Sequence, residues 1–160
     1  MRRLVVRYKI RSDRVDENQK YIRVKGDHDA NAQVHDDNFL KVLWDENARI
    51  IRIDWKEATS SMTDEDFKAT LTLFAGHVEQ KKARGILVDV SRFRHKPGPE
   101  VQPWRVKNIS NRYAAAGVKR QAFLFPKGAQ MQPMRSSPEE KFLTETFDDV
   151  QKAEAWLTAG

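Results

Sequence analysis

The pattern of hydrophobic and polar residues is clearest between Ala83 and His95, which read ARGILVDVSRFRH. Ile86, Leu87 and Val88 form a short aliphatic run without a polar break. Such a run is typical of a strand that is buried on both faces, as parallel strands between helices are. Open α/β sheets usually place their binding surface at the carboxyl ends of their strands. The polar residues expected at this end are Asp89, Ser91, Arg92, Arg94 and His95.

A hairpin and a helix are predicted upstream of this central strand. Residues 39–44 and 49–55 each read as a strand, and the connection Asp45-Glu46-Asn47-Ala48 predicts a β-hairpin. Thr63 is the expected N-cap of the helix that follows. Apolar residues recur in that helix at positions i, i+4, i+7 and i+11, which places them on one face. They are Phe67, Leu71, Phe74 and Val78.

A second helix, two strands and a last helix are predicted downstream. Pro97 and Pro99 exclude a continuous helix after the central strand, and Pro103 fits only the first turn of the next helix. We expect that helix to end at Gly117 and to bury Val106, Ile109, Tyr113 and Ala116. Further strands are expected at residues 122–125 and 142–147. Asp148 is the expected cap of the last helix.

The amino-terminal part of the chain is predicted to consist of an appendage and a linker. Residues 1–25 read as one strand and a short helix. A lone strand leaves backbone groups unpaired, so we expect this appendage to pair with the main sheet or with a second copy of the chain in a homodimer. Residues 26–37 are expected to be a polar linker. Their histidines and aspartates also admit a metal site, although they lack the spacing of a calcium-binding loop.

The composition excludes several classes of protein. There is no cysteine among the 160 residues, which excludes disulfides and thiolate metal ligands. No apolar stretch approaches the roughly 20 residues that span a bilayer, and the first residues lack the apolar core of a signal peptide. We therefore expect a cytoplasmic protein. No paired zinc histidines and no phosphate-cradling glycine loop occur, so no cofactor is predicted.

The net charge of +6 is concentrated in one segment. Residues 92–120 hold eight basic residues and one acidic residue, a net charge of +7. Residues 1–91 are close to neutral, and residues 121–160 are slightly acidic. A local excess of this kind attracts anionic partners. The alternative is a solvated helix face whose lysines and arginines serve solubility.

Residues 38–160 resemble the STAS domain group, which includes the bacterial anti-sigma-factor antagonists, the SpoIIAA-like domains and the STAS/SEC14-like domains. The resemblance rests on four segments: FLKVLWDENARIIRIDW, ILVDVSRFRH, NRYAAAGVKRQAFLFP and TFDDVQKAEAWL. It implies an α/β fold with a mixed sheet of four or five strands and helices mainly on one face. It also implies a non-enzymatic role in binding a partner or a small ligand.

One departure from this group concerns its phosphorylation switch. In the regulated antagonists an Asp-Ser-Ser-like step opens the helix after the central strand, and phosphorylation of the serine blocks partner binding. The matching region here is His95-Lys96-Pro97-Gly98-Pro99, which has no hydroxyl group. The switch is therefore not expected in this chain.

A binding module is the function that these patterns favour. Its basic surface is expected to meet an acidic protein, an anionic lipid headgroup or a phosphorylated small molecule through seven residues: Arg92, Arg94, His95, Lys96, Trp104, Arg105 and Arg112. A SEC14-like domain for lipids or metabolites is one alternative. A hydrolase that uses Asp89, Ser91 and His95 is another, although these groups would have to meet in space. Nucleic acid is not expected, because no reader motif accompanies the charge.

Overall fold

The computed structural model describes residues 31–129 and 139–159, so the predicted appendage of residues 1–25 lies outside the described residues. Along the chain the elements are β1 (Asn31–Asp36), β2 (Leu40–Asp45), β3 (Ile50–Trp55), the 3-10 helix η3 (Glu57–Ser61), α1 (Asp64–Lys81), β4 (Gly85–Asp89), α2 (Val101–Arg105), the π-helical segment η4 (Val106–Ser110), α3 (Asn111–Ala116), β5 (Arg120–Leu124), β6 (Leu143–Phe147) and α4 (Val150–Thr158).

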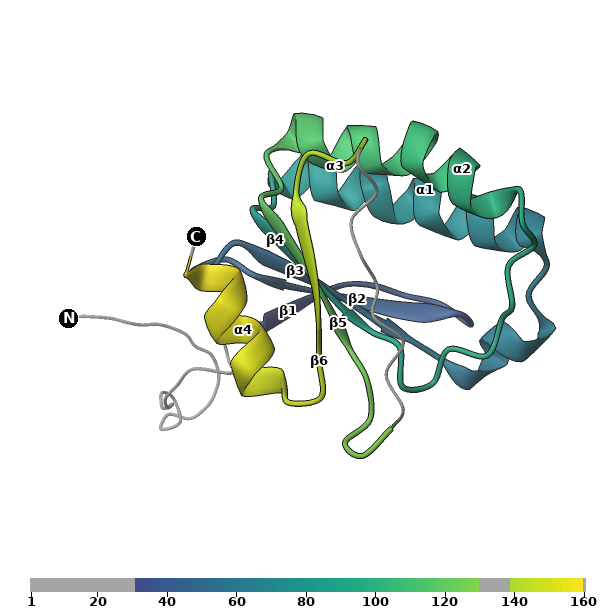
Figure 1. The fold of residues 1–160 in the computed structure, drawn as a ribbon, viewed down its shortest axis with the longest axis horizontal. Coiled ribbons are helices and arrows are strands. Elements are labelled where there is room, and N and C mark those ends of the chain that lie inside the picture. Colours follow the sequence, from purple (N-terminus) through teal and green to yellow (C-terminus); the bar gives the residue numbers. More distant parts are fainter. Residues whose placement is uncertain (1–30, 130–138, 160) are drawn as a thin grey trace, which may run out of the picture. The chain divides into compact units, whose positions relative to one another are not determined.

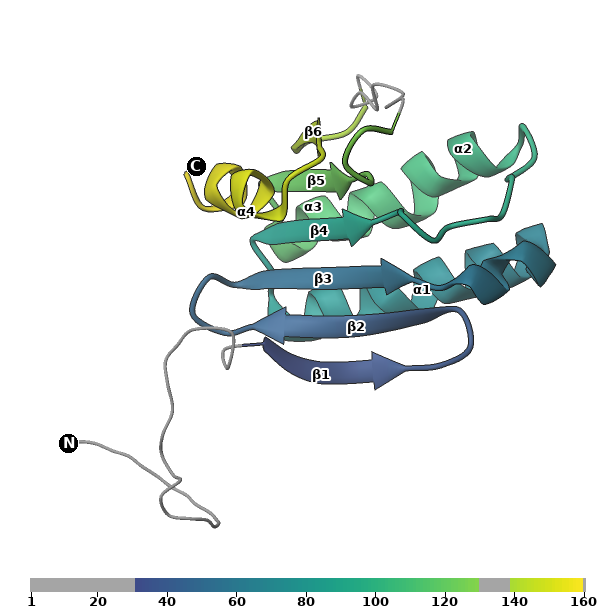
Figure 2. The same cartoon turned by 90° about the horizontal axis from the view of Figure 1, so that it is seen from below.

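The strands form one mixed six-stranded sheet in the order β1-β2-β3-β4-β5-β6 (Figure 2). β2 and β3 pair antiparallel as the predicted hairpin, whereas β3, β4, β5 and β6 run parallel. β4 therefore lies between two parallel neighbours, and Ile86 and Leu87 are almost completely buried. The prediction of a central strand buried on both faces is confirmed.

The prediction of four to five strands was too low, because residues 31–36 form β1 instead of part of a linker. Their sequence, NAQVHD, is polar, and most of these side chains are exposed. Val34 alone packs against the core from this strand. An edge strand pairs on one side only and needs few apolar residues, so the hydropathy pattern did not reveal it.

The helices cover the two faces of the sheet unequally (Figure 1). The chain passes from β3 through α1 to β4, and from β4 through α2–α3 to β5, always in the same direction across the sheet. Right-handed crossovers in one direction place their helices on the same face. α4, after the last strand, packs on the opposite face against β4, β5 and β6. The expected arrangement of helices mainly on one face thus holds for α1, α2 and α3 but not for α4.

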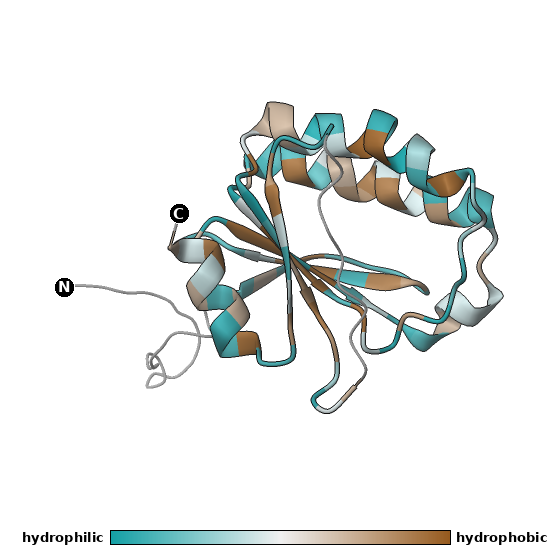
Figure 3. Cartoon of the chain, viewed as in Figure 1, coloured by the Kyte–Doolittle hydropathy of each residue, from teal (hydrophilic) through white to brown (hydrophobic). Residues whose placement is uncertain are grey.

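Each face of the sheet has its own apolar core, and hydrophobic positions recur along the strands and helices in Figure 3. Alternate residues of β2 and β3 point to the α1 side and belong to the larger cluster, which contains Leu40, Val42, Trp44, Ile51, Ile53 and Trp55. The predicted stripe of α1 (Phe67, Leu71, Phe74 and Val78) is buried against them. A smaller cluster joins Leu87, Ala122 and Leu124 to Ala153 and Leu157 of α4.

The helix ends agree with the predicted caps except in α4. The Thr63 hydroxyl accepts a hydrogen bond from the Asp66 amide, and the Asp66 carboxylate accepts one from the Thr63 amide, so α1 begins with a capping box. Gly117 ends α3 in a left-handed conformation, with φ of 110°. The cap of α4 is Asp149, whose carboxylate accepts from the Lys152 amide at 3.1 Å, and not Asp148. Two consecutive aspartates are equivalent by cap preference, so the pattern could not separate them.

Candidate functional site

The carboxyl ends of β3 and β4 form the surface on which the prediction was centred. A cavity of about 290 Å³ lies there. We call it the strand-end pocket, and its lining residues are Lys41, Asp54, Trp55, Lys56, Asp89, Ser91 and Arg92.

Asp89 organises this pocket. Its Oδ1 accepts hydrogen bonds from the amide and the hydroxyl of Ser91, at 3.0 and 2.7 Å. Its Oδ2 accepts from Arg52 Nη2 at 3.2 Å, and Arg52 Nε also donates to Asp54 Oδ1 at 2.6 Å. One guanidinium therefore pairs with both carboxylates of the pocket and offsets one of their two negative charges.

Two cations at the strand-end pocket are free to bind a ligand. Among the described residues, no hydrogen bond or ion pair involves the side chain of Arg92 or of Lys41, and Arg92 is exposed. Lys56 is different, because its ammonium group pairs with Asp36 and donates to the carbonyl of Asp37. The positive potential available to a ligand thus comes mainly from Arg92 and Lys41.

Arg94 and His95 are held by the β3–α1 connection and the start of α1. The Arg94 amide donates to Thr59 Oγ1 at 2.8 Å, and its guanidinium lies 3.4 Å from Glu57. The ring of His95 packs near Phe67 and Phe93, and its Nε2 is 2.8 Å from Asp64 Oδ1. With a side chain only 9% exposed, His95 fastens the loop instead of facing solvent.

Arg105 belongs to a buried polar cluster in the helix layer. Its Nη1 lies 3.3 Å from Glu140 Oε2, and the side chain of Glu140 is 1% exposed. The Ser110 hydroxyl donates to the same carboxylate oxygen. Removal of Arg105 would take an ion-pair partner from a carboxylate that is almost completely buried, which is destabilising. Arg105 therefore has a structural role.

Arg112 lies at the other end of the helix layer. It donates to both oxygens of Glu79, at 2.8 and 2.6 Å. The hydrogen bond from Arg112 lowers the pKa of Glu79, and Glu79 raises the pKa of Arg112. Glu79 is in the last turn of α1, which returns the chain to the start of β4. Arg112 therefore lies toward the strand starts, away from Arg92.

The two remaining predicted residues are Lys96 and Trp104. Lys96 is exposed in the loop after β4 and has no hydrogen-bond or ion-pair partner among the described residues. Trp104 is partly buried, and the ammonium of Lys68 lies 5.5 Å from its ring centroid.

The structure thus divides the basic segment into three places. Arg92, Arg94 and Lys96 lie in the loop after β4, Arg105 and Arg112 lie in the helix layer, and Lys119 and Arg120 lie at the start of β5. The charge is concentrated in the sequence but not on one surface.

The three residues of the alternative hydrolase have separate partners. Ser91 donates directly to Asp89, whereas His95 pairs with Asp64. A nucleophilic serine requires a base such as histidine within hydrogen-bond reach, with a third group orienting that base. The contacts of the described residues do not form this arrangement.

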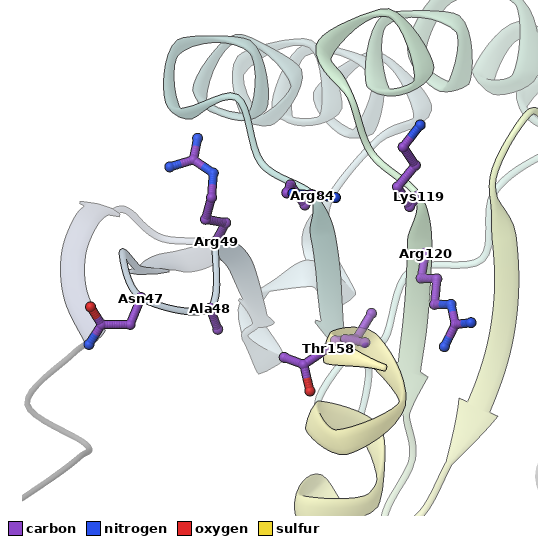
Figure 4. Close-up of a pocket in the computed structure, with 8 residues that line it drawn as sticks. Asn47, Ala48, Arg49, Arg84, Lys119, Arg120 and Thr158 are labelled. Carbon is purple, nitrogen blue, oxygen red and sulfur yellow. The ribbon is translucent and has the colours of Figure 1, made fainter. Parts of the chain in front are cut away.

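A second cavity, which the sequence analysis missed, lies at the opposite ends of the parallel strands (Figure 4). We call it the strand-start pocket. Its volume is about 280 Å³, and its lining residues are Asn47, Ala48, Arg49, Arg84, Lys119, Arg120, Leu157 and Thr158. A signal for it exists in the sequence, because a basic residue directly precedes each of β3, β4 and β5.

Comparisons of the chain with protein-family models, with curated proteins and with solved structures find no match. The resemblance to STAS domains therefore stays a prediction. Within residues 31–129 and 139–159, no helix is long and apolar enough to cross a membrane. In the same residues, no group of three or more His, Asp or Glu side chains is placed to hold a metal ion.

Proposed function

We propose that this chain is a non-enzymatic, STAS-like binding module that engages an acidic segment of a partner protein through the strand-end pocket. The observation that supports this proposal is the position of Arg92 and Lys41. Both cations border a cavity at the carboxyl ends of the parallel strands, and among the described residues neither side chain forms a hydrogen bond or an ion pair.

The chemistry of this pocket suits a carboxylate. The guanidinium of Arg92 presents a planar fork that matches the two oxygens of Asp or Glu. Arg52 pairs with both acidic groups of the pocket, Asp54 and Asp89, and offsets one of their two negative charges. Arg92 and Lys41 outweigh the negative charge that remains, so an incoming carboxylate meets a pocket of net positive charge.

The role of the other predicted residues follows from their contacts. Arg94 and His95 fix the loop that carries Arg92 through Thr59 and Asp64. They act on binding through the position of that loop, and Lys96 adds an exposed positive charge on the same segment.

The test is a titration of the full chain with a labelled Glu-rich peptide, followed by fluorescence anisotropy, with a Gln-rich peptide of the same length as the ligand control. Substitution Arg92→Glu is expected to weaken binding at least about tenfold, since a lost charged hydrogen bond contributes about 1.5–3 kcal/mol. Lys107→Glu is the matched control, because Lys107 is an exposed cation in the helix layer. Equal loss in both variants, or no loss in Arg92→Glu, contradicts the proposal.

A further inference from the structure

The strand-start pocket contains a row of cations that the fold places in register. Ile50 of β3 pairs with Gly85 of β4, and Gly85 pairs with Arg120 of β5. Arg49, Arg84 and Lys119 each stand one residue before these positions. Backbone hydrogen bonds connect the three residues across the sheet. The Arg84 amide donates to the Arg49 carbonyl at 2.9 Å, and the Lys119 amide donates to the Arg84 carbonyl at 2.8 Å.

Such a row carries an electrostatic cost. Like charges on directly opposed residues of neighbouring strands destabilise a sheet, and no carboxylate from residues 31–129 or 139–159 lines this pocket. The described acid that pairs with this row is Glu46, whose carboxylate lies 3.7 Å from Arg49 Nη1 and is 74% exposed. The repulsion between Arg84 and its neighbours is therefore not compensated among the described residues.

Four cations line this pocket: Arg49, Arg84, Lys119 and Arg120. Arg49 and Arg120 each have a structural role that explains their presence. Arg49 Nη2 donates to the carbonyls of Lys81 and Lys82, at 2.8 and 3.0 Å, and so caps the carboxyl end of α1. Arg120 Nη1 donates to the carbonyl of Trp156 at 2.6 Å, near the end of α4, and its guanidinium lies 4.9 Å from the Trp156 ring centroid. Both contacts place a positive charge at the negative end of a helix dipole.

Arg84 and Lys119 have no such role. Both side chains are exposed, and neither forms a hydrogen bond or an ion pair with another described residue. Figure 4 shows Arg84 and Lys119 at the starts of neighbouring strands, with Arg49 on the far side of Arg84. Helix capping therefore accounts for Arg49 and Arg120 but leaves the charges of Arg84 and Lys119 unexplained.

We propose that the strand-start pocket is a second anion site, which binds the phosphoryl group of a small molecule or free phosphate. A phosphoryl group brings up to two negative charges and three acceptor oxygens to one point, and Arg49, Arg84 and Lys119 stand side by side at the starts of three neighbouring strands. The cavity of about 280 Å³ is slightly smaller than the roughly 300–1,000 Å³ of drug-sized ligand sites. The cavity is small, and the end of α4 lines one side of it. Both features favour a compact ligand over a peptide or a nucleic acid.

The experiment is a titration of the 15N-labelled full chain with inorganic phosphate, followed by NMR, with sodium chloride at matched ionic strength as the ion control. We expect saturable shifts of the Arg84 and Lys119 amides with phosphate only. The double substitution Arg84→Gln with Lys119→Gln is expected to weaken phosphate binding at least about tenfold. Lys107→Gln is the matched control and is expected to bind as the unchanged chain does.

Equal shifts with chloride, or unchanged phosphate affinity in the double variant, would overturn the proposal. The spectrum of the variant also reports whether it is folded, and Arg84→Lys, which keeps the charge, is expected to retain binding. A parallel titration with glycerol 3-phosphate separates the two ligand sources: tighter binding than phosphate assigns the site to a phosphorylated small molecule, and weaker binding assigns it to free phosphate. Arg92→Glu is expected to leave both titrations unchanged, so this test is independent of the strand-end pocket.

Discussion

Arg112 and Glu79 form a two-point ion pair between α3 and α1, with nitrogen–oxygen distances of 2.8 and 2.6 Å. Each side chain is about one-third to two-fifths exposed. The pair joins two helices and uses the Nε–Nη2 edge of the guanidinium, which a carboxylate of a partner would need. A residue that the sequence pattern assigned to the binding surface is therefore committed to contacts within the chain.

Substitution Arg112→Gln is expected to leave the affinity for the Glu-rich peptide within about twofold. The cost in the free energy of unfolding is expected to be below about 1 kcal/mol, because the pair is partly exposed to solvent. Anisotropy and urea unfolding measure the two quantities. A loss of affinity as large as that expected for Arg92→Glu would show that Arg112 belongs to the binding surface.

Thr59 of η3 is expected to be the most sensitive of the residues that support the loop carrying Arg92. Its side chain is buried, accepts from the Arg94 amide at 2.8 Å and donates to the Lys56 carbonyl at 2.7 Å. Thr59→Val keeps the shape but leaves the Arg94 amide without its acceptor, at an expected cost of about 1–3 kcal/mol. Urea unfolding measures this cost. Ser61→Ala, which removes an exposed hydroxyl, is the control and is expected to have little effect.

His77 is expected to make stability depend on pH. Desolvation lowers the pKa of His77 from 6.5, and the charges of His35 and Lys81 lower it further. As the pH falls below 6.5, the unfolded chain takes up a proton at this residue that the folded chain does not yet bind. The free energy of unfolding therefore decreases until the pH passes the lowered pKa of the folded state.

The variant His77→Leu tests this dependence. Its unfolding in urea at about pH 7.5 and about pH 5.5 is expected to differ less than that of the unchanged chain. His77 Nδ1 is buried and has no hydrogen-bond partner among the described residues, so leucine leaves no partner unsatisfied. An identical pH dependence in both proteins would show that other groups cause it.

Arg84→Gln is expected to stabilise the protein when phosphate is absent. The substitution removes like-charge repulsion in the row of Arg49, Arg84 and Lys119, which is of the order of 0.2–1 kcal/mol. The gain is expected to shrink in 1 M sodium chloride, since the Debye length falls there to about 3 Å. Thermal unfolding at low and high salt measures both effects. Destabilisation by this substitution at low salt would show that Arg84 supports the fold.

The sequence predicted those parts of the fold that depend on local chemistry. Ile86 and its neighbours, the Thr63 cap and the stripe from Phe67 to Val78 were all read from patterns within one element. β1 was missed because an edge strand does not need an apolar repeat. An element was predicted when the contacts that determine its structure lie within its own segment, and it was missed when they lie in other parts of the chain.

The candidate sites were harder to predict because they depend on register between distant segments. Arg49, Arg84 and Lys119 are far apart in the chain, and only the pairing of β3, β4 and β5 places them side by side. Conversely, Arg92 and Arg112 are close in sequence but lie at different ends of the fold. A count of charges along the chain therefore located the basic segment correctly without locating a surface.

The π-helical segment Val106–Ser110 affects how the helix between β4 and β5 is aligned with the sheet. In a regular α-helix each residue advances by about 100°, so Ile109 would be rotated about 80° from Val101. A wide turn takes up about one additional residue, which returns Ile109 to the face of Val101, and both are buried. Deletion of one residue from the wide turn would give a regular helix in which Val101 and Ile109 still share a face, about 20° apart, whereas a regular helix of the present length would place them about 80° apart. The wide turn thus lets this helix hold one additional residue without changing the face that it buries.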